Sequence, residues 1–70
     1  MEEYVVNKHT QLSTGFNKIH KIDCVKKPNE ENTINLGKCI CIIDAENRAK
    51  NYFQKVNGCK YCCKEIYYKN

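Results

Sequence analysis

The stretch that decides the predicted fold is Thr33-Ile34-Asn35-Leu36-Gly37-Lys38-Cys39-Ile40-Cys41-Ile42-Ile43, residues 33–43. Most of its aliphatic side chains fall on one face and its cysteines on the other, and such alternation predicts a half-buried β-strand. Residues 18–26 alternate more loosely. The polar segment between the two carries a Pro-Asn turn signal at Pro28. The pattern therefore predicts a β-hairpin that joins 18–26 to 33–43.

The pattern is weaker toward the C-terminus. Residues 44–57 allow two structures, namely a short helix with Asp44 as its N-cap or two strands that turn at Asn57-Gly58. Residues 60–68 alternate again and predict a C-terminal strand. The expected fold class is therefore small, disulfide-rich and mainly β, with the helix at 44–57 as one of the two alternatives.

Length and composition limit the hydrophobic core. The chain has 70 residues, six of them cysteine and none of them tryptophan. A domain of this size rarely holds together by apolar burial alone. We therefore expect one disulfide-stapled domain over residues 1–70, in which residues 1–17 form a loosely attached arm.

The cysteines are expected to supply the missing stability as disulfides. The spacing leaves the pairing open, although bridges between early and late cysteines close the longest loops. The residues concerned are Cys24, Cys39, Cys41, Cys59, Cys62 and Cys63. Because disulfides persist in oxidising compartments, we expect a secreted protein in which Met1 is an added initiator. This interpretation needs no metal and no cofactor.

Zinc is the alternative to disulfides. Cys39-x-Cys41 and Cys59-x-x-Cys62 together offer four thiolates at the spacing of a zinc site, and His20-x-x-x-Cys24 offers alternative ligands. Under this alternative the chain is a cytosolic zinc-stapled adaptor, for example a viral one, that binds nucleic acid or a host protein.

The order of the cysteines resembles that of single-domain von Willebrand factor type C peptides. The resemblance covers residues 24–63 and consists of an early Cys24, the strand motif Cys39-Ile40-Cys41 and the late pair Cys62-Cys63. It implies a small, mostly β, secreted protein that binds other proteins. That family has eight cysteines where this chain has six, and Lys64 stands where the family usually has proline, so the resemblance implies no functional residue.

The C-terminal half carries the net positive charge of +4, and lysine and tyrosine residues follow one another there. Tyrosine side chains often anchor protein interfaces, and basic side chains beside them can complement an acidic partner. The expected partner-binding residues are Lys60, Tyr61, Lys64, Tyr67, Tyr68 and Lys69.

Several classes of function are not expected. The sequence has no glycine-rich phosphate loop and no convincing set of catalytic groups, so we expect no enzymatic activity. The run Ile40–Ile43 is too short to span a membrane, and a single arginine makes nucleic acid a less favoured partner. We expect a toxin-like or salivary, immune-modulator-like inhibitor that occludes an extracellular protein, such as a host-defence factor, a protease or an ion channel. The sequence leaves the target and the oligomeric state open.

Overall fold

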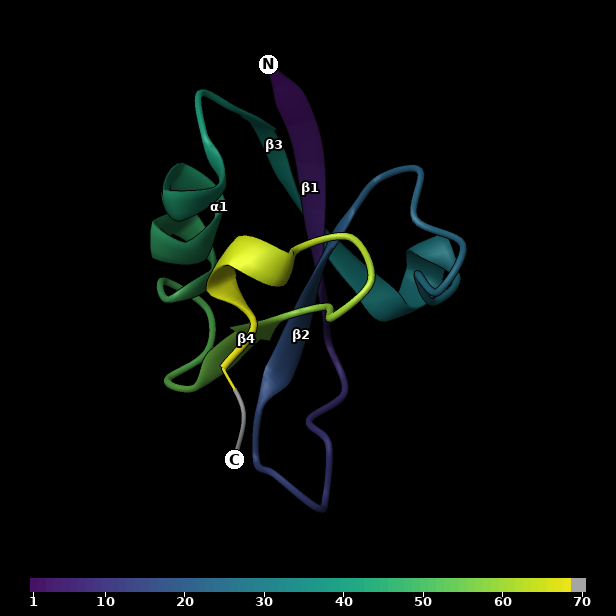
Figure 1. The fold of residues 1–70 in the computed structure, drawn as a ribbon. Coiled ribbons are helices and arrows are strands. Elements are labelled where there is room, and N and C mark those ends of the chain that lie inside the picture. Colours follow the sequence, from purple (N-terminus) through teal and green to yellow (C-terminus); the bar gives the residue numbers. More distant parts are fainter. Residues whose placement is uncertain (69–70) are drawn as a thin grey trace.

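A four-stranded sheet with an α-helix on one side forms the fold in a computed structural model, which describes residues 1–68 (Figure 1). The strands run in the order β3-β1-β2-β4 across the sheet. The elements are β1 (Glu2–Asn7), β2 (Asn17–Lys21), β3 (Thr33–Cys39), α1 (Ile42–Ala49), β4 (Val56–Gly58) and the two short 3-10 helices η1 (Glu30–Asn32) and η2 (Lys64–Ile66). The prediction of a small, mainly β protein with a short helix is confirmed.

The first strand, β1, lies in the middle of the sheet. It pairs antiparallel with β2 on one side and with β3 on the other. Tyr4, Val5 and Val6 are all buried, so both faces of β1 are covered. A short apolar run of this kind is typical of a strand buried on both faces. Residues 1–17, expected to form a loosely attached arm, therefore contain the central strand.

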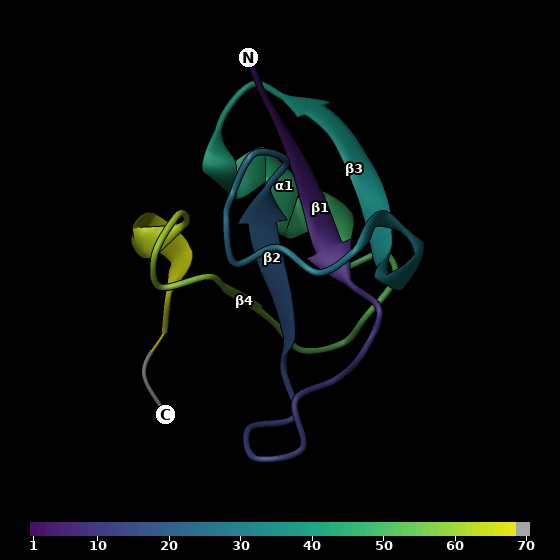
Figure 2. The same ribbon diagram turned by 90° about the vertical axis from the view of Figure 1, so that its right-hand side faces the viewer.

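The predicted hairpin between 18–26 and 33–43 is wrong. Each segment does contain a strand, but β2 and β3 lie on opposite sides of β1. The connection over residues 22–32 crosses one face of β1, and α1 covers the other face (Figure 2). The backbone N–H of Ile22 starts this crossing with a hydrogen bond of 2.9 Å to the carbonyl oxygen of Glu3. Alternation within a segment predicts a strand, but it does not say which strand will be its partner.

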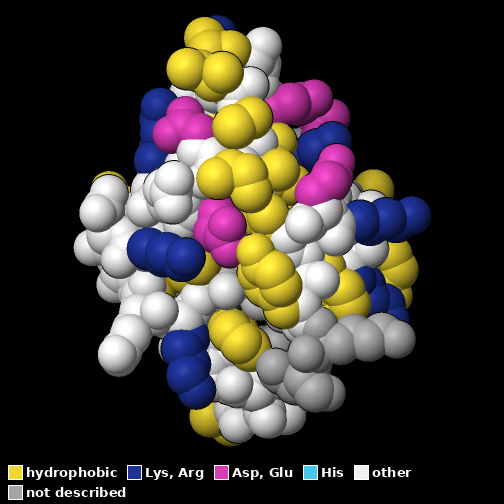
Figure 3. Space-filling model, turned by 60° about the vertical axis from the view of Figure 1, so that its left-hand side comes forward, with side chains coloured by type: hydrophobic (Ala, Val, Ile, Leu, Met, Phe, Trp, Pro, Cys, Tyr) yellow, Lys and Arg dark blue, Asp and Glu magenta, His cyan; other side chains and the backbone are white. Residues whose placement is uncertain are grey.

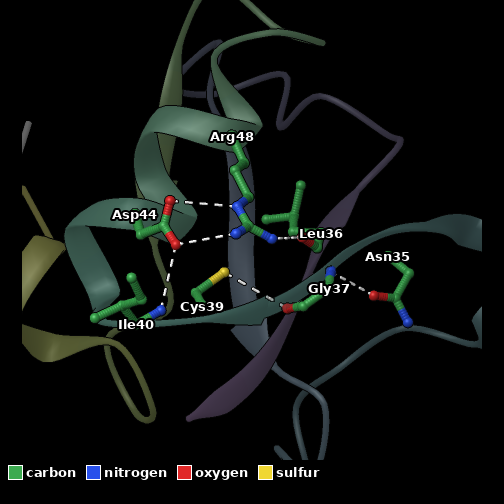
Figure 4. Close-up of polar contacts among 7 residues, drawn as sticks. All are labelled: Asn35, Leu36, Gly37, Cys39, Ile40, Asp44 and Arg48. Carbon is green, nitrogen blue, oxygen red and sulfur yellow. Dashed lines mark hydrogen bonds and ion pairs between the residues drawn. The ribbon is translucent and has the colours of Figure 1, made fainter.

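Polar contacts fix α1 against the end of β3 (Figure 4). Asp44, in the first turn of the helix, accepts the backbone N–H of Ile40 at 3.3 Å and forms a salt bridge of 3.1 Å with Arg48. Arg48 also donates to the backbone carbonyl of Leu36 in β3 at 2.9 Å. The helix spans Ile42–Ala49, so it begins two residues before the helix predicted over 44–57 and ends well before residue 57.

Replacing Arg48 by methionine is expected to lower the free energy of unfolding by about 1–2 kcal/mol. The change removes two charge-assisted contacts, but the partly exposed position reduces their value. Lys50→Met is the matched control, since it removes the same charge from an exposed side chain. Denaturant unfolding measures the difference, and equal midpoints for the two variants would contradict the role given to Arg48.

The core lies between the sheet, α1 and η2. Its buried members are Tyr4, Val6, Ile19, Leu36, Cys39, Ala45, Ala49, Val56, Cys63 and Ile66. Some apolar side chains remain outside it, including Ile40 and Ile43 near the start of α1. Figure 3, which looks onto the α1 side, shows hydrophobic side chains in a band with acidic side chains beside it. Among the described residues, no helix has the length and apolar character needed to cross a membrane.

The predicted strand at 60–68 is also wrong. After β4 the chain turns back and forms η2, whose Ile66 is fully buried. Gly58 makes this possible, because a Cβ atom there would lie 2.5 Å from the carbonyl oxygen of Cys63 and 2.7 Å from Ile66 Cγ1. Asn57-Gly58, one of the predicted hairpin turns, lies within β4 instead.

Candidate metal centre

The two strands that carry the site, β2 and β4, run parallel. Their carboxyl ends therefore meet at the same edge of the sheet. The register pairs Ile19 with Gly58, and the N–H of Cys59 donates to the carbonyl of Ile19 at 2.9 Å. His20 and Cys59, the next residue of each strand path, thus become neighbours, and both are buried.

The turn after each strand adds one more cysteine. Cys24 follows β2 in a turn closed by a hydrogen bond of 3.0 Å from its N–H to the carbonyl of Lys21. Cys62 follows β4 in a turn that is closed by a hydrogen bond of 2.8 Å from the N–H of Cys63 to the carbonyl of Cys59. The ligand atoms of His20, Cys24, Cys59 and Cys62 all lie within 4.8 Å of one another.

His20 has no polar partner for one ring nitrogen. Its Nδ1 is buried and makes no hydrogen bond to the described residues, and the side chain is only 6% exposed. Leaving such a group unpaired costs about 1–3 kcal/mol. Burial, with Lys18 and Lys27 nearby, lowers the pKa of His20. The neutral imidazole that this favours is the form that binds a metal.

Backbone N–H groups point at the sulfur atoms. Cys59 Sγ accepts the N–H of Tyr61 at 3.4 Å. Burial raises the pKa of Cys59, but hydrogen bonds from the N–H groups of Tyr61 and Cys62 and from the thiols of Cys62 and Cys24 together outweigh it, so that the pKa falls below its usual value. Cys62 Sγ accepts the N–H of Lys21 at 3.3 Å. Burial and the neighbouring Cys24 thiol nevertheless raise the pKa of Cys62 strongly, and a bound cation reverses such a shift.

This donor set fits zinc. Three thiolates and one imidazole form a closed tetrahedral shell, with Zn–S distances of about 2.3 Å that imply S–S separations of about 3.8 Å. The four ligand atoms of the site lie within 4.8 Å of one another, so small side-chain rotations would bring them to the separations of a zinc site. Calcium and magnesium prefer oxygen ligands, so the sulfur-rich set selects against them.

Two of the four zinc ligands predicted from the sequence, Cys59 and Cys62, belong to the group, and the other two do not. Cys39 and Cys41 lie at the end of β3, on the other side of β1 from β2, and are outside the group. Their places are taken by His20 and Cys24, the alternative ligands of the sequence. The two motifs, H-x-x-x-C and C-x-x-C, are visible in the sequence, but the parallel pairing that joins them is not.

All six cysteines are free thiols in the described part of the chain. Of the three early cysteines, only Cys24 belongs to the group with Cys59 and Cys62. Cys63 directly precedes η2 and is fully buried, with its sulfur 3.6 Å from that of Cys62. Disulfide bonding thus stays a prediction.

The predicted partner-binding residues that the structure describes lie in the turn before Cys62, on η2 and directly after η2. Lys60 and Tyr61 lie in the turn between the two metal-site cysteines Cys59 and Cys62, and Tyr61 is 59% exposed. Tyr67 directly follows η2, and Lys18 Nζ lies over its ring at 4.9 Å from the centroid.

The remaining three residues of that set have other positions. Tyr68 donates its hydroxyl to Glu46 of α1 at 2.9 Å, so it holds this part of the chain against the helix. Lys64 is exposed on η2. Lys69 lies outside the described residues.

No family model, curated protein or solved structure matches the chain. The resemblance to von Willebrand factor type C peptides therefore stays a prediction from cysteine order. The function of the chain must accordingly be inferred from the geometry of the four-residue site.

Proposed function

We propose that this chain is a zinc-stapled binding module, in which one Zn²⁺ is held by His20, Cys24, Cys59 and Cys62. The observation that carries the proposal is the convergence of these four side chains within 4.8 Å, around an imidazole with an unpaired buried nitrogen. All four tetrahedral positions are filled by the protein, which is the arrangement of a structural site.

The metal would join the end of β2 to the segment that follows β4. That segment contains the buried residues Cys63 and Ile66, so its attachment also completes the core. In small metal-binding domains the free energy of metal binding serves as free energy of folding. The zinc ion thereby takes the stabilising role that the sequence suggested for disulfides.

The secreted, disulfide-stabilised inhibitor of an extracellular protein is the competing proposal. It would oxidise the cysteines to disulfides in a pairing that the sequence leaves open, and two of the sulfurs of Cys24, Cys59 and Cys62 are close enough to bond after a small movement. A disulfide would leave the imidazole of His20 without a role, whereas a zinc ion would use all four of the converging side chains, which is why we favour zinc.

Mass spectrometry of the unreduced protein distinguishes the two proposals. Under native conditions we expect the mass of the chain with one zinc ion bound. Under denaturing conditions we expect all six cysteines to react with a thiol-labelling reagent. Cys24→Ser is expected to weaken zinc binding by about tenfold or more, because it removes one thiolate ligand.

Cys41→Ser is the matched control, since Cys41 is exposed and outside the metal group. It should keep one zinc ion with unchanged affinity. A metal-free native mass that is lower by two or more hydrogens would contradict the zinc proposal and support the secreted one.

A further inference from the structure

A hollow of about 340 Å³ opens beside the metal site. His20 and Cys59 contribute to its wall, together with Lys18, Lys60 and Tyr61. Lys18 and His20 flank the core residue Ile19 in β2, so they point to the opposite face of the sheet from the core. The volume lies at the lower end of the range for small-ligand sites.

The charge of this hollow is one-sided. Three lysines line it, Lys18, Lys26 and Lys60, and no acidic side chain does. No carboxylate lies within salt-bridge distance of these lysines in the part of the chain that the structure describes. The ammonium groups of Lys26 and Lys60 lie 5.2 and 5.5 Å from the centroid of the same ring, that of Tyr61. A bound anion would give these ammonium groups the charged partner that they lack among the described residues.

Aromatic rings accompany the lysines. Tyr61, which lines the hollow, is more than half exposed, and Lys18 also lies over the ring of Tyr67. A groove with cations for the backbone and rings for the bases is the usual arrangement for single-stranded nucleic acid. An acidic peptide would use the lysines but would leave the rings without a planar partner.

We propose that this hollow binds a nucleotide unit of single-stranded nucleic acid. The phosphate is bound by Lys18, Lys26 and Lys60, which draws Lys26 and Lys60 away from the ring of Tyr61, and a base stacks on the ring that they uncover. The proposal rests on the proposed zinc site, because Lys60 and Tyr61 lie between two of its ligands, Cys59 and Cys62. It names the partner class of the module and replaces the sequence-based expectation that nucleic acid is a less favoured partner.

Fluorescence anisotropy with a labelled oligothymidylate of about twelve nucleotides tests the proposal on the zinc-loaded chain. We expect the logarithm of the association constant to fall with the logarithm of the salt concentration, with a slope of about −2 for three phosphate contacts. Charge reversal in the double variant Lys26→Glu/Lys60→Glu should weaken binding by about tenfold or more and flatten this slope.

The matched control is Lys38→Glu/Lys50→Glu, which changes the net charge equally at exposed positions in β3 and after α1. It should change the affinity by less than about threefold. Tyr61→Ala should weaken binding by about fivefold to a hundredfold. Tyr52→Ala, at a similarly exposed tyrosine, should leave it unchanged.

Three results would overturn the inference. They are equal losses in the two double variants, no binding by the zinc-loaded chain at low salt, and a polyglutamate peptide that binds as tightly as the oligonucleotide. Native mass spectra of the same samples show whether zinc is bound. A zinc-loaded chain that binds no oligonucleotide would refute the nucleic-acid inference and leave the zinc proposal standing. Binding by a folded, zinc-free chain would support the nucleic-acid inference and refute the zinc site.

Discussion

Removal of zinc with a strong chelator is expected to unfold the chain. The metal would connect the end of β2 to the segment after β4, and without it Cys24, Cys59 and Cys62 lose their common partner. Apparent binding free energies of structural zinc are about 10–16 kcal/mol at neutral pH, which exceeds the stability expected from a core of this size. Circular dichroism should report loss of the sheet, and added Zn²⁺ should restore it.

Two controls make the chelation result specific. Mg²⁺ should not restore the fold, because the site offers no oxygen ligands. Cys41→Ser should unfold and refold like the parent chain, because Cys41 is not in the metal group. A chain that keeps its sheet and its melting temperature after complete metal removal would contradict the stabilising role of zinc.

Gly58→Ala is expected to destabilise the protein by about 3 kcal/mol or more. A Cβ atom at this position would lie 2.5 Å from the backbone oxygen of Cys63 and 3.0 Å from its Cβ. Backbone atoms cannot rotate away as a side chain can, so the segment that carries Cys59 and Cys63 must shift. The variant should also bind zinc more weakly, because Cys59 is the adjacent residue.

Gly15→Ala is the control for this prediction. Gly15 has a positive φ of 77°, which costs a side chain about 1–2 kcal/mol, but its added Cβ would meet only Lys55, at 3.9 Å. Denaturant unfolding and zinc titration measure both variants. A smaller loss of stability for Gly58→Ala than for Gly15→Ala would contradict the close packing of the C-terminal segment on β4.

Local structure was predictable where one segment decides it. Alternation found the strand that begins at Thr33, and Asp44 marked the start of a helix, although as its N-cap and not as a first-turn residue. Pairing was not predictable, because β1 inserts between β2 and β3. The short run Tyr4-Val5-Val6 gives little sign, within its own sequence, that it will become the central strand.

The metal site was also predictable only in its local parts. The motif Cys59-x-x-Cys62 is recognisable locally, and so is His20-x-x-x-Cys24, yet each supplies only half of a tetrahedral site. The parallel pairing of β2 with β4 brings the halves together, and that pairing covers only a few residues. The sequence favoured Cys39 and Cys41 as partners because C-x-C offers two thiolates at the spacing of a zinc site, but these residues lie at the end of β3, on the other side of β1 from β2.

X-ray absorption spectroscopy at the zinc edge tests the metal site most directly. For the native chain we predict one zinc ion with three sulfur neighbours at about 2.3 Å and one nitrogen neighbour at about 2.0 Å. His20→Ala should remove the nitrogen signal of the imidazole, since His20 is the histidine of the group. A shell of four sulfurs in the native protein, or a folded chain that holds no zinc, would contradict the site formed by His20, Cys24, Cys59 and Cys62.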